Sequence, residues 1–358
     1  MDFESLHGGF TRRDWQTVTD IEPVRFATIG LGWWTRNEAI PAFEQSDLAT
    51  MTVGVSRSAE NANALADDHD MIERGISVEE FHDGVAADEY DAVYICTPNA
   101  THPDLVTTAA ALGKDVLCEK PMAATSDGAR EMVEFCDEHG VTLMIAYRMQ
   151  TEPAVRRARE FIREGVIGDP IQVHGHMSDR VPDLFPDPDH WRLDPSLSGG
   201  ATLIDIGLYP LNTTRFLLDA DPTEGYAETF ADHEWFEGLD EHVTFSVTFG
   251  ESVSGAFTVS HNAHPSSHLQ VIGSEGEVRL EPAFFTDEDR RLRVTTEEAN
   301  STIEFDQVNQ MVEEFDYVAH CIRTGTEPVP NGRHGLRDIE VMEALYRSAE
   351  TGARVDLP

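Results

Sequence analysis

A lysine and a tyrosine are the residues of this sequence best suited to moving a proton. Lys120 stands in the segment CEKP, and Lys114 is the chain's other lysine, although lysine and arginine together number 26. Arginine serves for surface ion pairs, whereas proton chemistry often needs the compact donor and adjustable pKa of lysine. Tyr209, in the segment DIGLY, carries a phenol. A nearby ammonium group favours the phenolate form, so Lys120 and Tyr209 form a candidate catalytic couple.

Three further polar residues are candidates for contact with a substrate. Asp205 precedes Tyr209 by four residues, so a helix would place both side chains on one face. Asp205 would hold a substrate hydroxyl or orient Lys120, and Arg148 and Gln150 would reach other hydroxyls. Four of the candidates also have a plain structural alternative. Asp205 could be a helix-capping aspartate, Tyr209 a core tyrosine, Lys120 a partner of the neighbouring glutamate, and Arg148 an arginine that bridges two domains.

A glycine-rich turn is the first sign of a nucleotide site. The segment GLGWWT, residues 30–35, follows an apolar run and precedes a helix-length segment. Gly30 would permit a tight turn, and Gly32 would let the backbone approach a pyrophosphate at the helix N-terminus. Thr35 replaces the third glycine of the usual fingerprint, and Trp33 and Trp34 either shield the pyrophosphate or pack.

The end of the next predicted strand indicates which dinucleotide the turn would hold. An NAD enzyme carries an acid there to hold the ribose hydroxyls, whereas this chain has Ser56, Arg57 and Ser58. Such residues suit a 2′-phosphate, so the predicted cofactor is NADP. The alternative is that Arg57 is a solvated arginine at the start of a helix.

Two later segments are predicted to end strands at the same edge of the sheet. CTPNATH covers residues 96–102, and CEKP covers residues 118–121. In open α/β sheets the carboxyl ends of the strands bind the ligand, which would direct Lys120 toward the nicotinamide. The residues expected to contact the cofactor here are Thr97, Pro98, Asn99, His102, Glu119 and Lys120.

The order of apolar runs predicts an α/β protein with two domains. Five runs, VRFATIG, MTVGVSR, DAVYICTP, DVLCEKP and VTLMIAYRM, alternate with helical segments at 59–69, 102–112 and 126–139. This alternation predicts a parallel Rossmann sheet over residues 23–148. Residues 1–22 are expected to form an arm.

Residues 149–358 change in texture. After a predicted helix at 153–164, alternating runs in PIQVHGHMSD, HVTFSVTFG, VSGAFTVSH, LQVIGSEGEVRLE, LRVTT and STIEFD predict a large, mostly antiparallel open sheet in an α+β domain. Helices are expected at 307–323 and 335–351, and a C-terminal helix is a candidate to pack back on the first domain. An open sheet with an exposed face also favours a homodimer or homotetramer.

The charge balance restricts the partners and the environment. Of 358 residues, 66 are acidic and 26 basic, which gives a net charge of −40 without an acidic block. Salt screens such repulsion, so we expect a halophilic protein from a high-salt cytoplasm, with no nucleic-acid partner. Four cysteines lack a C-x-x-C pair and read as reduced core thiols, and neither a membrane span nor an export signal is expected.

Three motifs together resemble the glucose–fructose oxidoreductase / inositol dehydrogenase / MocA family. They are GLGWWT, CTPNATHPDLVTTAAALGKDVLCEKPMA and SGGATLIDIGLYPLN, and the resemblance runs from Val24 over nearly the whole chain. It implies that Lys120 lies beside the nicotinamide. Tyr209 stands where many inositol-dehydrogenase-like members have histidine, which resembles the branch of NADP-dependent D-xylose (aldose) 1-dehydrogenases. That resemblance implies oxidation of an aldose, D-xylose first, at C1 to its lactone.

Other functions and sites remain open at this point. The same fold could act on glucose, another polyol or a trans-dihydrodiol, or a non-catalytic regulator could bind NADP, although a regulator needs no activated phenol. His261, His264 and His268 suggest a metal by residue type, but no cysteine or H-E-x-x-H accompanies them, so no metal is expected. Trp191 and Arg192 are weaker candidates for the edge of a pocket.

Overall fold

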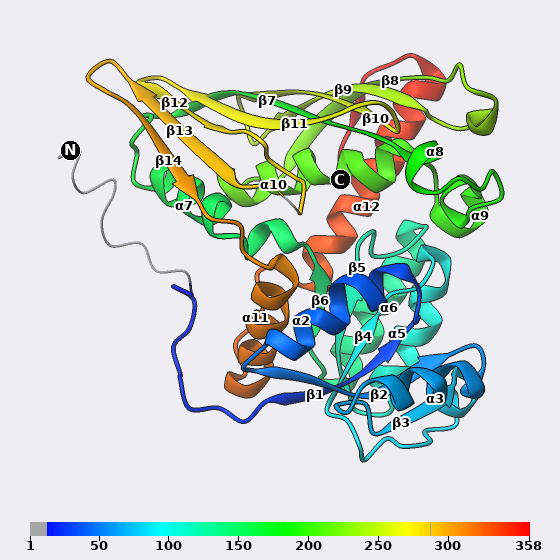
Figure 1. Cartoon of the computed structure of the whole chain (residues 1–358). Coiled ribbons are helices and arrows are strands. Elements are labelled where there is room, and N and C mark those ends of the chain that lie inside the picture. The colour runs from blue at the N-terminus through cyan, green and yellow to red at the C-terminus, as the bar shows by residue number, and fades with distance from the viewer. Residues whose placement is uncertain (1–12, 287) are drawn as a thin grey trace. The chain divides into compact units, whose positions relative to one another are not determined.

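The computed structural model describes residues 13–286 and 288–358 (Figure 1), so most of the predicted arm at 1–22 lies outside the described residues. The chain divides into two compact units. We call Trp15–Arg148 with Asn309–Leu336 the nucleotide unit, and we call Met149–Val308 with Arg337–Pro358 the sheet unit. The cut after Arg148 falls where the sequence texture changes, and the segment from Asn309 to Leu336 belongs with the earlier residues.

The nucleotide unit contains a parallel six-stranded sheet in the order β3-β2-β1-β4-β5-β6. This is the strand order of a Rossmann fold. The strands are β1 (Val24–Ile29), β2 (Ala49–Ser56), β3 (Arg74–Ser77), β4 (Ala92–Ile95), β5 (Asp115–Glu119) and β6 (Leu143–Ala146). Strand β3 is absent from the five predicted strands, because its four residues RGIS are too short to show an apolar alternation.

Helices flank this sheet, and several match their predicted ranges. They are α2 (Ile40–Gln45), α3 (Ala59–Asp68), α4 (Val78–His82), α5 (His102–Ala111), α6 (Ser126–His139) and α11 (Gln310–Thr324). Helix α6 begins at the Thr125 N-cap and ends at Gly140, whose φ of 65° is the left-handed conformation that glycine favours. Helix α4, with its Ser77–Glu80 capping box, is short and was not predicted.

An aromatic core joins α11 to the first strands. Phe315 of α11 stacks on Phe43 with 3.9 Å between ring centroids, and it meets Tyr94 edge-on at 5.1 Å. Phe26 of β1 completes the group, and all four side chains are almost fully buried. The nucleotide unit therefore draws its core from both ends of the chain.

The sheet unit contains nine strands in the order β14-β13-β12-β11-β7-β10-β9-β8-β15. Neighbours are antiparallel except β7 and β10, which pair in parallel, and this fits the predicted mostly antiparallel sheet. The strands are β7 (Pro170–Arg180), β8 (Pro222–Phe230), β9 (His242–Phe249), β10 (Val253–Ser260), β11 (Asn262–Gly273), β12 (Gly276–Leu280), β13 (Arg290–Thr296), β14 (Asn300–Phe305) and β15 (Val355–Asp356). Strand β8 was not predicted, because PTEGYAETF contains a proline, a glycine and two glutamates.

Helices of the sheet unit complete its layer against the sheet. They are α7 (Pro153–Arg163), α8 (Val181–Leu184), α9 (Pro195–Ser198), α10 (Leu208–Leu218) and α12 (Gly332–Thr351), whose residues from Arg337 onward belong to this unit. Short turns of other helix types are η4 (Trp191–Leu193), η5 (Leu203–Gly207) and η6 (Glu234–Phe236). Among the described residues, no helix combines the length and apolar character of a membrane span.

Candidate functional site

The turn after β1 is built around Gly30. Its φ is +94°, and a Cβ there would lie 2.1 Å from the carbonyl oxygen of Cys96. Thr35, fully buried, donates its hydroxyl to the Gly30 carbonyl at 2.5 Å, so threonine holds the turn where the third glycine usually stands. A Cβ on Gly32 would meet nothing within 4 Å. The backbone at Gly32 is therefore open to a ligand, which fits a dinucleotide.

A π-helical turn, η1 (Thr35–Ala39), follows directly and continues into α2. Such turns are rare and occur frequently at functional sites. Trp33 exposes 60% of its surface, whereas Trp34 is half-buried and packs against the core. Of the two tryptophans, Trp33 is the one placed to cover a ligand.

Strand β2 delivers the three residues proposed for a 2′-phosphate. Ser56 ends the strand, and Arg57 is exposed. The Ser58 hydroxyl accepts the Asn61 N–H at 3.4 Å as the N-cap of α3. Ser58 therefore has a structural task of its own, while Arg57 projects at the start of a helix where the dipole also favours an anion.

The CTPNATH and CEKPMA turns are tied together by a histidine. His102 is fully buried, with Nε2 2.9 Å from the Thr97 carbonyl and Nδ1 3.1 Å from the Met122 carbonyl. Burial lowers the pKa of His102, and the hydrogen bonds to backbone carbonyls oppose that shift. His102 thus connects the two strand ends. Direct contact between His102 and the cofactor stays a prediction, as it does for Thr97, Pro98 and the buried Asn99.

Glu119 ends β5 and Lys120 follows it, with a cis peptide bond between Lys120 and Pro121. Tyr94 donates its hydroxyl to Glu119 Oε1 at 2.7 Å, and the Lys120 N–H donates to Oε2 at 3.2 Å. Burial raises the pKa of Glu119, and the contacts with Tyr94 and Lys120 oppose it. The Glu119 carboxyl group therefore fixes the backbone from which the Lys120 side chain starts.

A second buried acid, missed in the sequence, faces Glu119. Glu314 of α11 is fully buried, and its carboxyl oxygens make no hydrogen bond with the described residues. Burial, followed by the charge of Glu119, raises the pKa of Glu314 well above its usual value, while Arg148 opposes the shift. Nothing in the sequence around Glu314 signals this placement, because Glu119 lies far away along the chain and only the fold brings the two acids near each other.

Arg148 and Gln150 lie in buried networks, each within its own unit. Arg148 is 7% exposed and donates to Gln310 Oε1. Gln150 is 2% exposed and donates to Asn212 Oδ1 at 3.0 Å, and Asn212 in turn donates to Asp338 at 2.7 Å. These contacts give both residues a framework role. Their contact with a substrate stays a prediction.

Asp205 and Tyr209 stand out along a segment that is otherwise buried. From residue 201 to residue 217 these two are the half-buried positions, and every other residue is buried. The expected regular helix is interrupted, because Asp205 lies in the π-helical turn η5 and Tyr209 in α10. The ring of Tyr209 packs on Phe284 with 5.8 Å between centroids. Both side chains are therefore partly accessible to solvent, unlike the other residues of this segment.

The glycine pair before η5 has a steric reason. Gly199 caps α9 with a φ of 85°, and Gly200 has a φ of +151°. A Cβ on Gly200 would lie 2.2 Å from the hydroxyl oxygen of Tyr346. That hydroxyl donates to Asp240, whose carboxylate accepts the N–H groups of Ala201 at 3.0 Å and Leu203 at 2.6 Å.

Asp240 thereby holds the start of η5. Burial raises the pKa of Asp240, and the hydrogen bonds from the Leu203 and Ala201 backbone oppose it. The sequence gives no warning of this role, since Asp240 lies some 35 residues from the turn that it caps.

Two nitrogens converge on Asp205. Arg192 Nε lies 3.3 Å from Asp205 Oδ2, and His261 Nε2 lies 3.4 Å from the same oxygen. The three histidines therefore have different surroundings. His261 contacts Asp205, His264 is exposed, and His268 stacks on His176 in the sheet. Across residues 13–286 and 288–358, no group of three or more His, Cys, Asp or Glu side chains is arranged to hold a metal.

The predicted site residues thus gather into two sets. The nucleotide unit brings together the Gly30 turn, the end of β4 and the end of β5, where Lys120 lies. The sheet unit brings together Asp205, Tyr209 and Arg192. The pairing of Lys120 with Tyr209 stays a prediction.

Comparisons with known proteins match both units. Residues 24–147 match the model described as "Oxidoreductase family, NAD-binding Rossmann fold", and residues 155–279 match the GFO/IDH/MocA C-terminal domain. A D-xylose 1-dehydrogenase [NADP(+)] of Haloarcula marismortui is 53% identical over 360 residues, which covers 100% of both chains. The chain belongs to the GFO/IDH/MocA oxidoreductase family.

Two further comparisons extend the likeness. A D-xylose 1-dehydrogenase (NADP(+)) 2 of Haloferax volcanii is 30% identical, covering 93% of this chain and 99% of its own. The crystal structure of aldose-aldose oxidoreductase from Caulobacter crescentus, complexed with glycerol, has a TM-score of 0.88 at 29% identity. It covers 94% of this chain and 100% of that one. The predicted family, fold class and oxidoreductase activity are confirmed.

Proposed function

We propose that this enzyme oxidises D-xylose at C1 to the corresponding lactone with NADP as hydride acceptor. The observation that carries the proposal is the full-length, 53% identical relative named D-xylose 1-dehydrogenase [NADP(+)]. The site residues agree with it, because the chain keeps a lysine at the end of β5 and an aspartate and tyrosine as the half-buried positions of η5 and α10.

The nucleotide unit supplies the cofactor site in this proposal. The open backbone at Gly32 and the N-terminal turn of η1 would hold the pyrophosphate, and Ser56 and Arg57 the 2′-phosphate. Trp33 would cover the nucleotide, while Thr35 and His102 hold its turns in place. When bound at this edge, NADP accepts the hydride from C1 of the sugar.

The protein residues handle the proton that leaves the C1 hydroxyl. Tyr209 takes it as the general base, and Lys120 is its proposed partner in the couple. Asp205 accepts a hydrogen bond from a sugar hydroxyl and so fixes the ring. Arg148 and Gln150 support the site through their buried networks.

Two substitutions test the couple. Tyr209→Phe and Lys120→Met should each lower kcat for D-xylose by about 100-fold or more, because general acid–base catalysis contributes on that order. NADPH binding, followed by fluorescence, should stay intact in Tyr209→Phe. Matched controls are Tyr226→Phe on β8 and Lys114→Met, whose amine contacts the Tyr90 carbonyl. Near-normal turnover in Tyr209→Phe or in Lys120→Met would rule out the proposed catalytic couple.

A substrate panel tests the reaction itself. D-xylose, D-glucose, other aldoses, polyols and trans-dihydrodiols would be offered with NADP in concentrated KCl, and NADPH formation followed by absorbance. We expect the highest kcat/KM with D-xylose. A faster polyol or diol would reassign the substrate, and tight NADPH binding without turnover of any compound would favour a regulator.

We also propose that the open sheet face joins two copies of the chain into a homodimer, or pairs of dimers into a homotetramer. The outward residues of the central strands are Gln172, His174, His176, Thr244, Ser246, Thr248, Ser254, Ala256, Thr258, Ser266, His268 and Gln270. None is acidic, in a chain with 66 acidic residues.

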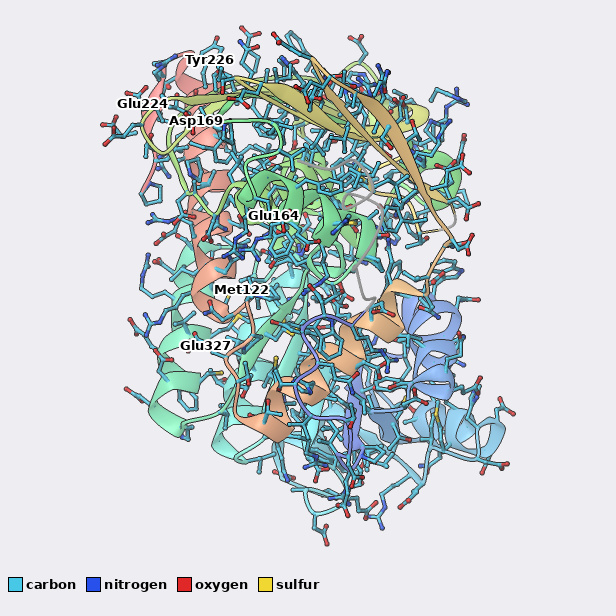
Figure 2. All side chains as sticks on the ribbon, turned by 90° about the vertical axis from the view of Figure 1, so that its left-hand side faces the viewer. Met122, Glu164, Asp169, Glu224, Tyr226 and Glu327 are labelled. Carbon is cyan, nitrogen blue, oxygen red and sulfur yellow. The ribbon has the colours of Figure 1, made fainter. Side chains whose placement is uncertain are left out.

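Acids return at the rim of this face, with Glu224 beside Tyr226 on β8 (Figure 2) and Glu277 on β12. A neutral centre with a charged rim is typical of an interface. Sedimentation in molar KCl should give a dimer or tetramer, and Thr258→Glu at the centre should shift it toward monomer. A monomeric wild type would overturn this proposal.

The high-salt assignment completes the proposal. The acidic surface and the relatives from Haloarcula and Haloferax support a halophilic enzyme of D-xylose catabolism that works in a salt-rich cytoplasm. Retention of activity in molar KCl checks the halophilic part, and loss of activity there would contradict it.

A further inference from the structure

His261 is a buried imidazole beside the proposed substrate carboxylate. Its side chain is 1% exposed, directly after β10, and its Nε2 lies 3.4 Å from Asp205 Oδ2. Within the described residues, neither ring nitrogen reaches hydrogen-bond geometry. A buried nitrogen left in this state is uncommon in folded proteins and calls for a functional explanation.

The backbone of His261 is held on both sides. Its N–H donates to the Glu241 carbonyl at 3.0 Å, and its own carbonyl accepts the Val181 N–H at 2.8 Å. The Phe236 ring lies 6.4 Å from the imidazole. These hydrogen bonds fix the backbone from which the imidazole projects, between the end of β10 and the start of α8.

The neighbouring acid on the buried side is already satisfied. Asp240 accepts N–H groups from Ala201 and Leu203 and the hydroxyl of Tyr346. Asp205 Oδ2, by contrast, lies 3.4 Å from His261 Nε2 and 3.3 Å from Arg192 Nε. Of the two aspartates, Asp205 is the one that an Nε2–H of His261 can orient.

We propose that His261 is a positioning residue for the reaction, and this rests on the proposed function. Its Nε2–H holds Asp205 from the buried side while Arg192, 27% exposed, holds it from the solvent side. Together they fix the plane of the carboxylate, so that Asp205 presents an acceptor to the sugar. A donor close to a carboxylate favours the charged form, so we expect the loss of the imidazole to lower activity most at low pH.

The pH dependence of this arrangement involves few groups. The groups that interact with His261, with Asp205 or with the neighbouring Asp240 come from η4 and the residue before it, η5, the segment before β9, and α12. The titratable or charged members are His190, Arg192, Asp205, Asp240, Glu241 and Tyr346.

The experiment compares two amides in place of the imidazole. In His261→Gln, the amide N–H falls near the position of Nε2, whereas in His261→Asn it does not reach. We expect His261→Asn to lower kcat/KM for D-xylose on the order of tenfold and to move the acidic limb of its pH profile up by about one unit. His261→Gln should recover most of the activity and the wild-type limb. Superimposable profiles for wild type and His261→Asn would overturn the proposal.

A second measurement does not depend on turnover or on the stability of the asparagine variant. Long-range ¹H–¹⁵N spectra report the tautomer of each histidine, and the His261 signals are those that vanish in His261→Gln. Replacing Asp205 by Asn should change these ring-nitrogen shifts, because it removes the carboxylate acceptor. Unchanged shifts would overturn the contact. If the wild type failed to oxidise D-xylose, the proposed function would be wrong. The ¹H–¹⁵N measurement would still show whether His261 contacts Asp205.

Discussion

Glu314 carries a carboxyl group into the interior of the nucleotide unit, beside Glu119. Below the usual carboxyl pKa, both the folded and the unfolded chain hold the proton, and the group has no effect. Above it the unfolded chain releases the proton while the folded chain retains it, because the pKa of Glu314 is raised by burial. The free energy of unfolding therefore falls as the pH rises.

Glu314→Gln should relieve this loss of stability. We expect the free energy of unfolding to rise at about pH 8, with little change at about pH 4, as measured by denaturant titration. Glu131→Gln, on the exposed side of α6, is the matched control and should leave it unchanged. An equal effect at both pH values would show that Glu314 does not retain its proton.

Arg57 decides the choice of cofactor in our proposal. Arg57→Asp should lower the ratio of kcat/KM with NADP to that with NAD by about tenfold or more, because a charge-assisted contact with the 2′-phosphate becomes a repulsion. Steady-state kinetics with both cofactors measure the ratio. Arg130→Asp on α6 makes the same charge change elsewhere and should leave it unaltered. An unaltered ratio in Arg57→Asp would place the 2′-phosphate on other residues.

At this scale the sequence reveals residues that carry a local motif. Lys120 and Tyr209 can be predicted because CEKP and DIGLY are contiguous signals. Asp240, His261 and Glu314 cannot, because each meets its partner through strand pairing or helix packing far along the chain. The set His261, His264 and His268 illustrates this limit, since the three differ in burial and only His261 lies beside Asp205.

The elements that present the site are two π-helical turns. Turn η1 follows the glycine turn, and η5 carries Asp205. Hydrophobic periodicity predicts a regular helix at both places, and it cannot report a one-residue widening that depends on local packing. Strands β3 and β8 were missed for a related reason, as their register is imposed by neighbouring strands rather than by their own alternation.

The backbone before η5 leaves no room for a side chain at Gly200. Gly200→Ala would place a methyl group against the buried Tyr346 hydroxyl at a φ of +151°. We expect a loss of about 2–4 kcal/mol in the free energy of unfolding and a lower kcat, since Asp205 follows directly. Gly238→Ala, also at positive φ but with nothing within 4 Å, separates the backbone strain from the collision. Equal losses in the two variants would exclude the collision.

At the scale of the whole molecule, charge dominates. A net charge of −40 repels itself, and the screening length falls from about 10 Å at 0.1 M salt to about 3 Å at 1 M. The melting temperature should therefore rise between about 0.1 M and 1 M KCl, measured by calorimetry. An uncharged osmolyte at equal osmolality is the control, and an equal rise with it would refute screening as the cause.

The nucleotide unit is assembled from Trp15–Arg148 and Asn309–Leu336, with Phe315 stacked on Phe43. During translation, the first 148 residues emerge while α11 is still to be made. Phe26, Phe43 and Tyr94 then lack the helix that covers them, and the ribosome must add the whole of β7 to β14 before it arrives. Most of the nucleotide unit is thus synthesised early, but its core can be completed only after α11 has been made.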